Sequence, residues 1–253
     1  MKSLDIFRSI KNKLLILFLF FSSITVLESY YCYTIFRERE ESVETRELIH
    51  RIDNEILQLN KLQLQYLVYD SRSKQYFQGN QSRYIEKYLQ RFDSLKQFIT
   101  QLSKKYIENS TKQEDLIALH AKLNSYHQDY NLLVSLVKQR GFRDYGIEGK
   151  MRKAIHEVEC YENYIDQITL LSIRRNEKDY FLRKDTIYII KVKENVNKLL
   201  EQIAESTTVP EDTKKLIVNL LSEYERQFQH WVDIDAKIGI DQSNGLSLKI
   251  KNC

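Results

Sequence analysis

The stretch LSIRRNEKDYFLRKD, residues 171–185, carries charges where a helix in a bundle would carry apolar side chains. Steps of four and three residues follow the spacing of a buried helical seam. Here they pass through Leu171, Arg175, Lys178, Leu182, Asp185 and Ile189. A charged layer between helices loses its hydration, so its members must pair with one another or with a ligand that enters the bundle.

Acidic neighbours offset only part of this charge. Asp179 can pair with Arg175 and with Arg183 across one helical turn, which leaves a surplus of basic groups. Guanidinium groups bind carboxylates through two parallel hydrogen bonds, so an anionic ligand fits this segment. The alternative is a ladder of ion pairs that satisfies itself. The predicted ligand-binding residues are Arg174, Arg175, Lys178 and Arg183, and Glu177, Asp179 and Asp185 would orient them.

A second polar face lies in GIEGKMRKAIHEVE, residues 146–159, where Arg152, His156 and Glu159 are one helical turn apart. We assign Arg152 and His156 a supporting role at the site, with an exposed polar face or a packing hydrogen bond as the alternative. His50 and Glu47 have the Glu-x-x-His spacing of di-iron bundles. A second such pair is absent from the sequence, so we predict no metal and no cofactor.

RRNEKDYFLRKD and GIEGKMRKAIHEVE together resemble the helical bimodular (HBM) sensor domain of bacterial chemoreceptors (methyl-accepting chemotaxis proteins) and sensor histidine kinases. The resemblance covers residues 146–185. It implies two stacked four-helix modules that share long helices outside the membrane, and a homodimer. Sensors of this family are associated with small organic acids, so the resemblance implies that the anion is a small carboxylate.

Composition favours an all-α, elongated helical bundle, because the 253 residues include only one Pro and six Gly. The net charge is +4 without a dense basic run, which argues against nucleic acid as a partner. The three cysteines have no CxxC spacing and predict neither a disulfide framework nor a zinc site. The absence of HExxH, GxSxG and GxxxxGK[ST] motifs predicts that the chain is not an enzyme.

Residues 14–36, LLILFLFFSSITVLESYYCYTIF, predict a transmembrane helix that follows a basic cytoplasmic segment, residues 1–13. The uninterrupted apolar run ends before Glu28 and would also suit a signal peptide, but no A-x-A-like cleavage site follows it. We therefore predict a single span in the bacterial inner membrane. Residues 37–253 would form the extracytoplasmic sensor domain.

An internal duplication is indicated by a shift of 104 residues, which places KQYF, residues 74–77, on KDYF, residues 178–181. Any two amphipathic helices align by heptad, but two turns match as well. ENSTKQED corresponds to ESTTVPED, and GFRDYGIEGKMR corresponds to GIDQSNGLSLKIK. Because the sequence stops soon after the last match, we expect the final helix and a second span to be missing from it.

These features predict the sensor region of a membrane signal-transduction receptor, in which a small carboxylate displaces helices. The alternative is a membrane-tethered scaffolding coiled coil without a ligand. A scaffold predicts a charged motif paired within itself. A sensor predicts a pocket between helices whose basic groups lack a full set of acidic partners.

Overall fold

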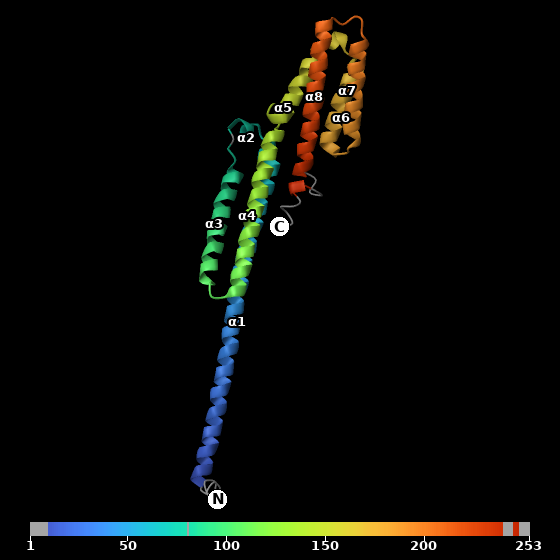
Figure 1. Ribbon diagram of the computed structural model, residues 1–253. Coiled ribbons are helices and arrows are strands. Elements are labelled where there is room, and N and C mark those ends of the chain that lie inside the picture. The colour runs from blue at the N-terminus through green and yellow to red at the C-terminus, as the bar shows by residue number, and fades with distance from the viewer. Residues whose placement is uncertain (1–9, 80, 240–244, 248–253) are drawn as a thin grey trace. The chain divides into compact units, whose positions relative to one another are not determined.

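The computed structural model describes residues 10–79, 81–239 and 245–247, and within them all regular secondary structure is helical (Figure 1). No strand occurs in this part of the chain, so the all-α prediction is confirmed. The chain divides into two compact units, Met1–Leu57 and Gln58–Cys253. Most of the predicted cytoplasmic segment and the expected continuation after residue 247 lie outside the described residues.

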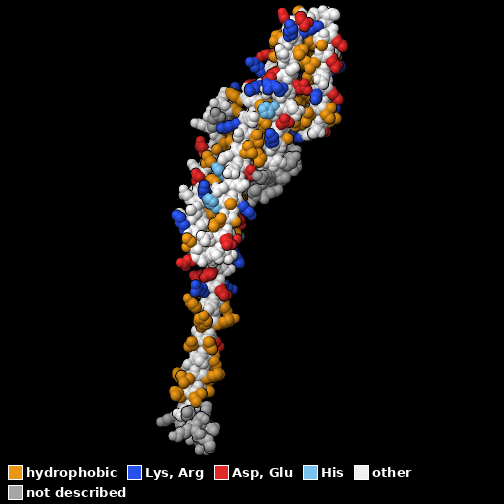
Figure 2. Space-filling model, viewed as in Figure 1, with side chains coloured by type: hydrophobic (Ala, Val, Ile, Leu, Met, Phe, Trp, Pro, Cys, Tyr) orange, Lys and Arg blue, Asp and Glu red, His pale blue; other side chains and the backbone are white. Residues whose placement is uncertain are grey.

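The first unit contains most of helix α1, Ile10–Tyr69, which is long and apolar enough to cross a membrane. Its apolar side chains are exposed, as Phe18 illustrates with 68% exposure, and Figure 2 shows hydrophobic groups along this segment. The hydroxyl groups of Ser23, Thr25 and Thr34 donate to carbonyls three residues earlier in the helix. These polar groups are therefore satisfied inside the helix, as an apolar surrounding requires.

The second unit begins with the end of α1 and with a break in the helix. A 3-10 turn, Asp70–Arg72, and the extended residue Ser73 separate α1 from the short helix α2, Lys74–Gly79. Helices α3, Arg83–Lys105, and α4, Ser110–Arg140, then pack as a hairpin. Ser82 and Asn109 immediately precede these two helices, and their side chains accept hydrogen bonds from backbone N–H groups of the first turn.

The rest of the unit is built from α5, Gly146–Glu159, α6, Gln167–Arg183, α7, Ile187–Glu205, and α8, Glu211–Ile238. A 3-10 turn, Glu162–Tyr164, lies between α5 and α6. Helix α5 packs on α8, α6 packs on α7, and α8 contacts both α7 and α4 (Figure 1).

Buried positions repeat along the chain as the proposed duplication requires. We call residues 58–140 the first repeat and residues 162–238 the second repeat. Helix α3 begins at Arg83 and α7 begins 104 residues later at Ile187. At the same shift both members of each pair are buried: Tyr76 and Tyr180, Tyr88 and Val192, Phe92 and Val196, Leu95 and Leu199, Ile99 and Ile203. Helix α7 has 19 residues against 23 in α3, and α8 has 28 against 31 in α4. The second hairpin is thus shorter by about one turn in each helix.

The turn after α4 and the turn after α8 each contain the same close approach of two glycines, which helical periodicity does not explain. Gly141 and Gly146 both have positive φ, and a Cβ on Gly146 would lie 2.6 Å from the Gly141 Cα. Gly239 and Gly245 also have positive φ, and a Cβ on Gly245 would lie 2.8 Å from the Gly239 Cα. Only glycine allows this approach of the two backbones. The paired turns therefore support duplication over a chance alignment of amphipathic helices.

Candidate functional site

Helix α6 presents a different face to the interior from the one predicted. Its buried residues include Leu170, Ile173, Glu177 and Tyr180, whereas the predicted seam residue Leu182 is 81% exposed. The two stripes have the same spacing but are offset by one residue, which corresponds to a rotation of about 100° around the helix axis. The ring of Tyr180 decides between them because it packs edge-on against Phe228 and Trp231 of α8. The prediction that residues 171, 175, 178, 182, 185 and 189 form the buried seam is therefore wrong.

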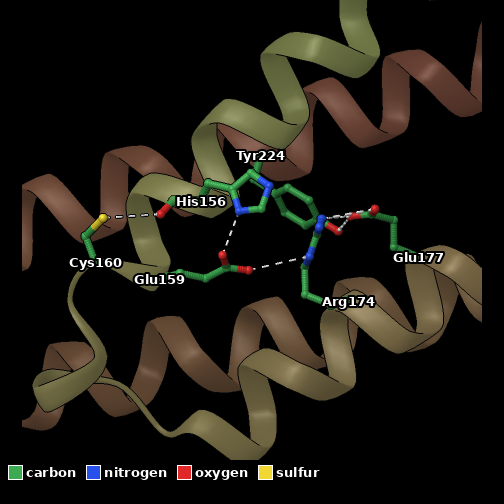
Figure 3. A network of polar contacts seen from close by, with 6 residues as sticks. All are labelled: His156, Glu159, Cys160, Arg174, Glu177 and Tyr224. Carbon is green, nitrogen blue, oxygen red and sulfur yellow. Dashed lines mark hydrogen bonds and ion pairs between the residues drawn. The ribbon is translucent and has the colours of Figure 1, made fainter. Parts of the chain in front are cut away.

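The buried charge of α6 is Glu177, and its partner Arg174 is half-buried (Figure 3). Nη1 of Arg174 donates to both oxygens of Glu177, at 3.1 and 3.0 Å. The hydroxyl of Tyr224, on α8, donates to Oε2 of the same carboxylate at 2.8 Å. Burial raises the pKa of Glu177, and Arg174 and Tyr224 oppose that rise. Arg174 is thus neutralised inside the protein, where the sequence predicted a ligand.

His156 and Glu159 extend this network towards the surface of α5 (Figure 3). Glu159 lies 3.6 Å from Nε of Arg174 and 2.6 Å from Nδ1 of His156. The structure therefore joins the predicted residues His156, Arg174 and Glu177 in one network. Arg152 is half-buried on α5; burial raises the pKa of Glu148, and the charge of Arg152 is one of those that oppose the rise.

The remaining predicted basic residues lie on the outer face of α6. Lys178 is exposed, and the side chain of Arg175 is 85% exposed. Asp179 lies 3.9 Å from Arg175 and 3.8 Å from Arg183, as the spacing predicted. Such solvated pairs contribute little to stability. Asp185 accepts the backbone N–H of Ile187 instead of orienting a cation.

A buried cluster that the sequence did not reveal joins α4, α6 and α8. Asp235 accepts from Arg140 at 3.0 Å and from Lys184 at 2.6 Å. The Asp235 and Arg140 side chains are 5% and 8% exposed. Both cations also lie near the ring of Trp231, at 5.7 Å for Arg140 and 4.6 Å for Lys184. The only signal in the sequence was that Asp235 stands four residues before Gly239, as the buried Val137 stands four residues before Gly141.

A pocket of about 290 Å³ lies between α4, α5 and α8, and we call it the interhelical pocket. Its lining residues are Lys138, Gln139, Gly146, Ile147, Lys150, Arg226, Gln227 and His230.

One neighbouring carboxylate, Glu223, offsets part of the pocket's positive charge. It lies 2.6 Å from Arg226, and this hydrogen bond, the bond from Gln227 and the charge of Lys150 lower its pKa. Among the described residues, Lys138 and Lys150 have no ion pair within 4 Å. The interhelical pocket therefore has surplus positive charge, which the sequence analysis placed on α6.

A second pocket, of about 410 Å³ between α7 and α8, has a balanced lining. Lys193 and Arg226 line it together with Glu225 and Asp233, so its charge does not favour an anion. In the described part of the chain, no group of three or more metal-binding side chains occurs.

Comparison with models of known protein families finds no match, and comparisons with curated proteins and with solved structures find none either. The resemblance to the helical bimodular sensor domain remains a prediction.

Proposed function

We propose that this chain is the ligand-binding sensor region of a membrane signal-transduction receptor and that it recognises a small organic acid. One observation carries the proposal: Lys138, Lys150 and Arg226 line a pocket between three helices that has no carboxylate among its lining residues, and Glu223 pairs with one of the three cations, Arg226. A carboxylate ligand would complete the charge balance. The proposal retains the ligand class expected from the sequence and moves the binding residues from α6 to α4, α5 and α8.

The position of the pocket suggests how binding could be transmitted. Its lining comes from the end of α4, the start of α5 and the middle of α8, so a ligand would bridge elements on both sides of the Gly141–Gly146 turn. A ligand that binds one packing of these helices more tightly shifts the population towards that packing. The proposed architecture is two stacked four-helix modules that share long helices and function as a homodimer.

The membrane part of the proposal rests on α1, whose apolar segment is preceded by basic residues. We propose a single span in a bacterial inner membrane, with the second unit outside the cytoplasm. Sedimentation of the full chain in detergent micelles should show a dimer that a saturating cognate acid stabilises. A strict monomer under that condition would contradict the proposed assembly.

The ligand proposal is tested with the full chain in detergent micelles, using acetate, succinate, malate and citrate as probes. Thermal shift identifies the acid that stabilises the protein, and calorimetry measures its Kd. Removing one solvent-accessible cation should cost about 1 kcal/mol, which raises Kd about fivefold. We therefore expect Lys138→Ala and Lys150→Ala each to weaken binding by about that factor, and the double variant to weaken it by more than tenfold.

The matched control is Arg175→Ala, which removes an exposed cation of α6 that does not line the interhelical pocket. This variant should bind the acid as the wild type does. If Arg175→Ala or Lys178→Ala abolishes binding and Lys150→Ala does not, the site lies on α6. If none of the four acids stabilises the chain, the sensor proposal fails.

The second candidate function is a membrane-tethered scaffolding coiled coil without a ligand. It is favoured by the internal pairing of the charged motif, since Arg174 is satisfied by Glu177 and Arg175 and Arg183 share Asp179. A scaffold would show no thermal shift with any of the acids.

A further inference from the structure

A cleft of about 790 Å³ lies beside the helix break in the first repeat. Its lining residues are Gln65, Tyr69, Asp70, Ser73, Gln75, Tyr76, Gln81, Arg83 and Tyr84. This volume lies within the range of about 300–1,000 Å³ that is common for small-molecule sites. The lining is polar and aromatic, and its only charged members are Asp70 and Arg83.

Asp70 has an unsatisfied carboxylate oxygen. Its Oδ2 atom is buried and has no hydrogen-bond partner, and no cation within 4 Å forms an ion pair with Asp70 among the described residues. The negative charge contributes to the raised pKa of the nearby Tyr76 and Tyr130, for which burial is the largest cause. A buried acceptor without a donor is unfavourable, so this position favours a ligand that brings an N–H donor and a positive charge.

Arg83 supplies the opposite charge at the same cleft. Its Nη2 donates to the hydroxyl of Tyr84 at 2.7 Å, and its guanidinium lies 4.8 Å from the centre of that ring. The hydrogen bond to Tyr84 is the largest cause of the raised pKa of Arg83, and Asp70 adds to the rise. Asp70 and Arg83 thus influence each other without forming an ion pair. The other guanidinium nitrogens can bind a carboxylate.

The second repeat provides an internal comparison because its equivalent positions are filled. A shift of 104 residues places Asp70 on Arg174 and Ser73 on Glu177. In the second repeat these two side chains pair with each other at 3.0 Å inside an uninterrupted helix α6. In the first repeat the helix is broken at the same place, and the acid has no partner. The two repeats therefore differ in whether the position holds an internal ion pair or an acid without a partner.

We propose that the cleft of the first repeat binds the zwitterionic head group of an α-amino acid, with its ammonium at Asp70 and its carboxylate at Arg83. A ligand with only a positive charge would be repelled by Arg83, and a ligand with only a negative charge would be repelled by Asp70. A zwitterion matches both groups and the zero net charge of the lining. Tyr69 is 58% exposed and stacks on Tyr84 at 5.8 Å, so it offers an aromatic face to the rest of the ligand.

The test uses the full chain in detergent micelles and the twenty proteinogenic L-amino acids as probes. Thermal shift should identify at least one that stabilises the protein, and calorimetry should give its Kd. Two analogues of that amino acid are then measured: the amine that lacks the carboxylate and the acid that lacks the amino group. Each analogue should bind at least tenfold more weakly, because each leaves Asp70 or Arg83 without its partner.

Asp70→Asn and Arg83→Gln should each raise the Kd of the amino acid at least tenfold. The matched controls are Asp93→Asn and Lys87→Gln, exposed residues of α3 that do not line the cleft, and they should bind as the wild type does. Circular dichroism checks that the variants retain their helices. The proposal is overturned if no amino acid binds, if Asp70→Asn binds equally well, or if the amine alone binds as tightly as the amino acid.

This cleft shares no lining residue with the interhelical pocket, so the two proposals can fail independently. Asp70→Asn should leave the Kd of the organic acid unchanged, and Lys150→Ala should leave the Kd of the amino acid unchanged.

Discussion

Asp235→Ala is expected to destabilise the protein severely, because Asp235 is the carboxylate that pairs with both Arg140 and Lys184. Without it, the Arg140 side chain, 8% exposed, would be a buried charge without a partner. Lys184 is 20% exposed and can turn its ammonium group towards water. Removing one partner of a buried ion pair costs about 3–5 kcal/mol. For a chain of this size that cost corresponds to a fall in Tm of about 6–20 °C.

The assay is thermal and urea unfolding of the full chain in detergent micelles, followed by circular dichroism. The matched control is Asp233→Ala on the same helix, whose exposed carboxylate accepts one hydrogen bond from Gln229. We expect the control to cost less than about 0.5 kcal/mol. A double variant, Arg140→Met with Asp235→Leu, removes both buried charges and should recover most of the lost stability.

Two results would refute this reasoning. One is a fall in the free energy of unfolding of Asp235→Ala that lies within about 1 kcal/mol of the fall measured for Asp233→Ala. The other is a double variant no more stable than Asp235→Ala, which would show that the unpaired charge of Arg140 is not the cause.

Three further predictions concern the turns, the half-buried His127 and the membrane topology. Gly146→Ala should lower the free energy of unfolding in urea by more than about 1–2 kcal/mol, because Gly146 has φ +64° and a Cβ there would lie 2.6 Å from the Gly141 Cα. Gly79→Ala should lower it far less, because nothing lies within 4 Å of a Cβ at that position. Burial lowers the pKa of His127 below 6.5, so the neutral ring contributes stability that is present above pH 6.5 and lost as the pH falls through its pKa in the folded protein. His127→Phe should therefore reduce the loss of stability between pH 6.5 and about 5, and an unchanged pH profile would exclude His127 as the cause. A reporter enzyme that is active only outside the cytoplasm should be active when fused after Cys253 in a bacterial host, and activity of a cytoplasmic reporter alone would reverse the topology.

The sequence by itself determined the class of structure and the repeat. A single Pro and six Gly leave long intervals without helix breakers, and the structure has helices in those intervals. The repeat was detectable because residues that pack at equivalent positions keep their spacing. The shift of 104 residues found in the sequence relates buried pairs such as Tyr76 and Tyr180. The matching turns were detectable because the positive φ of Gly141, Gly146, Gly239 and Gly245 favours glycine at these positions.

Only the tertiary structure decided which face of α6 is buried. Leu170, Ile173 and Tyr180 form a stripe with helical spacing, and so do Leu171, Lys178 and Leu182, so periodicity alone could not choose between them. Contacts with α8 select the first stripe, because Tyr180 packs there against Phe228 and Trp231.

The same rotation determines the charges of the candidate site. It buries Glu177 beside Arg174 and leaves Arg175 in solvent. The interhelical pocket was missed for a different reason: Lys138, Lys150 and Arg226 lie on three different helices, so no spacing within one helix relates them. Sequence spacing reports which residues share a helix face, but the pairing of charges between helices depends on how each helix is rotated in the packed protein.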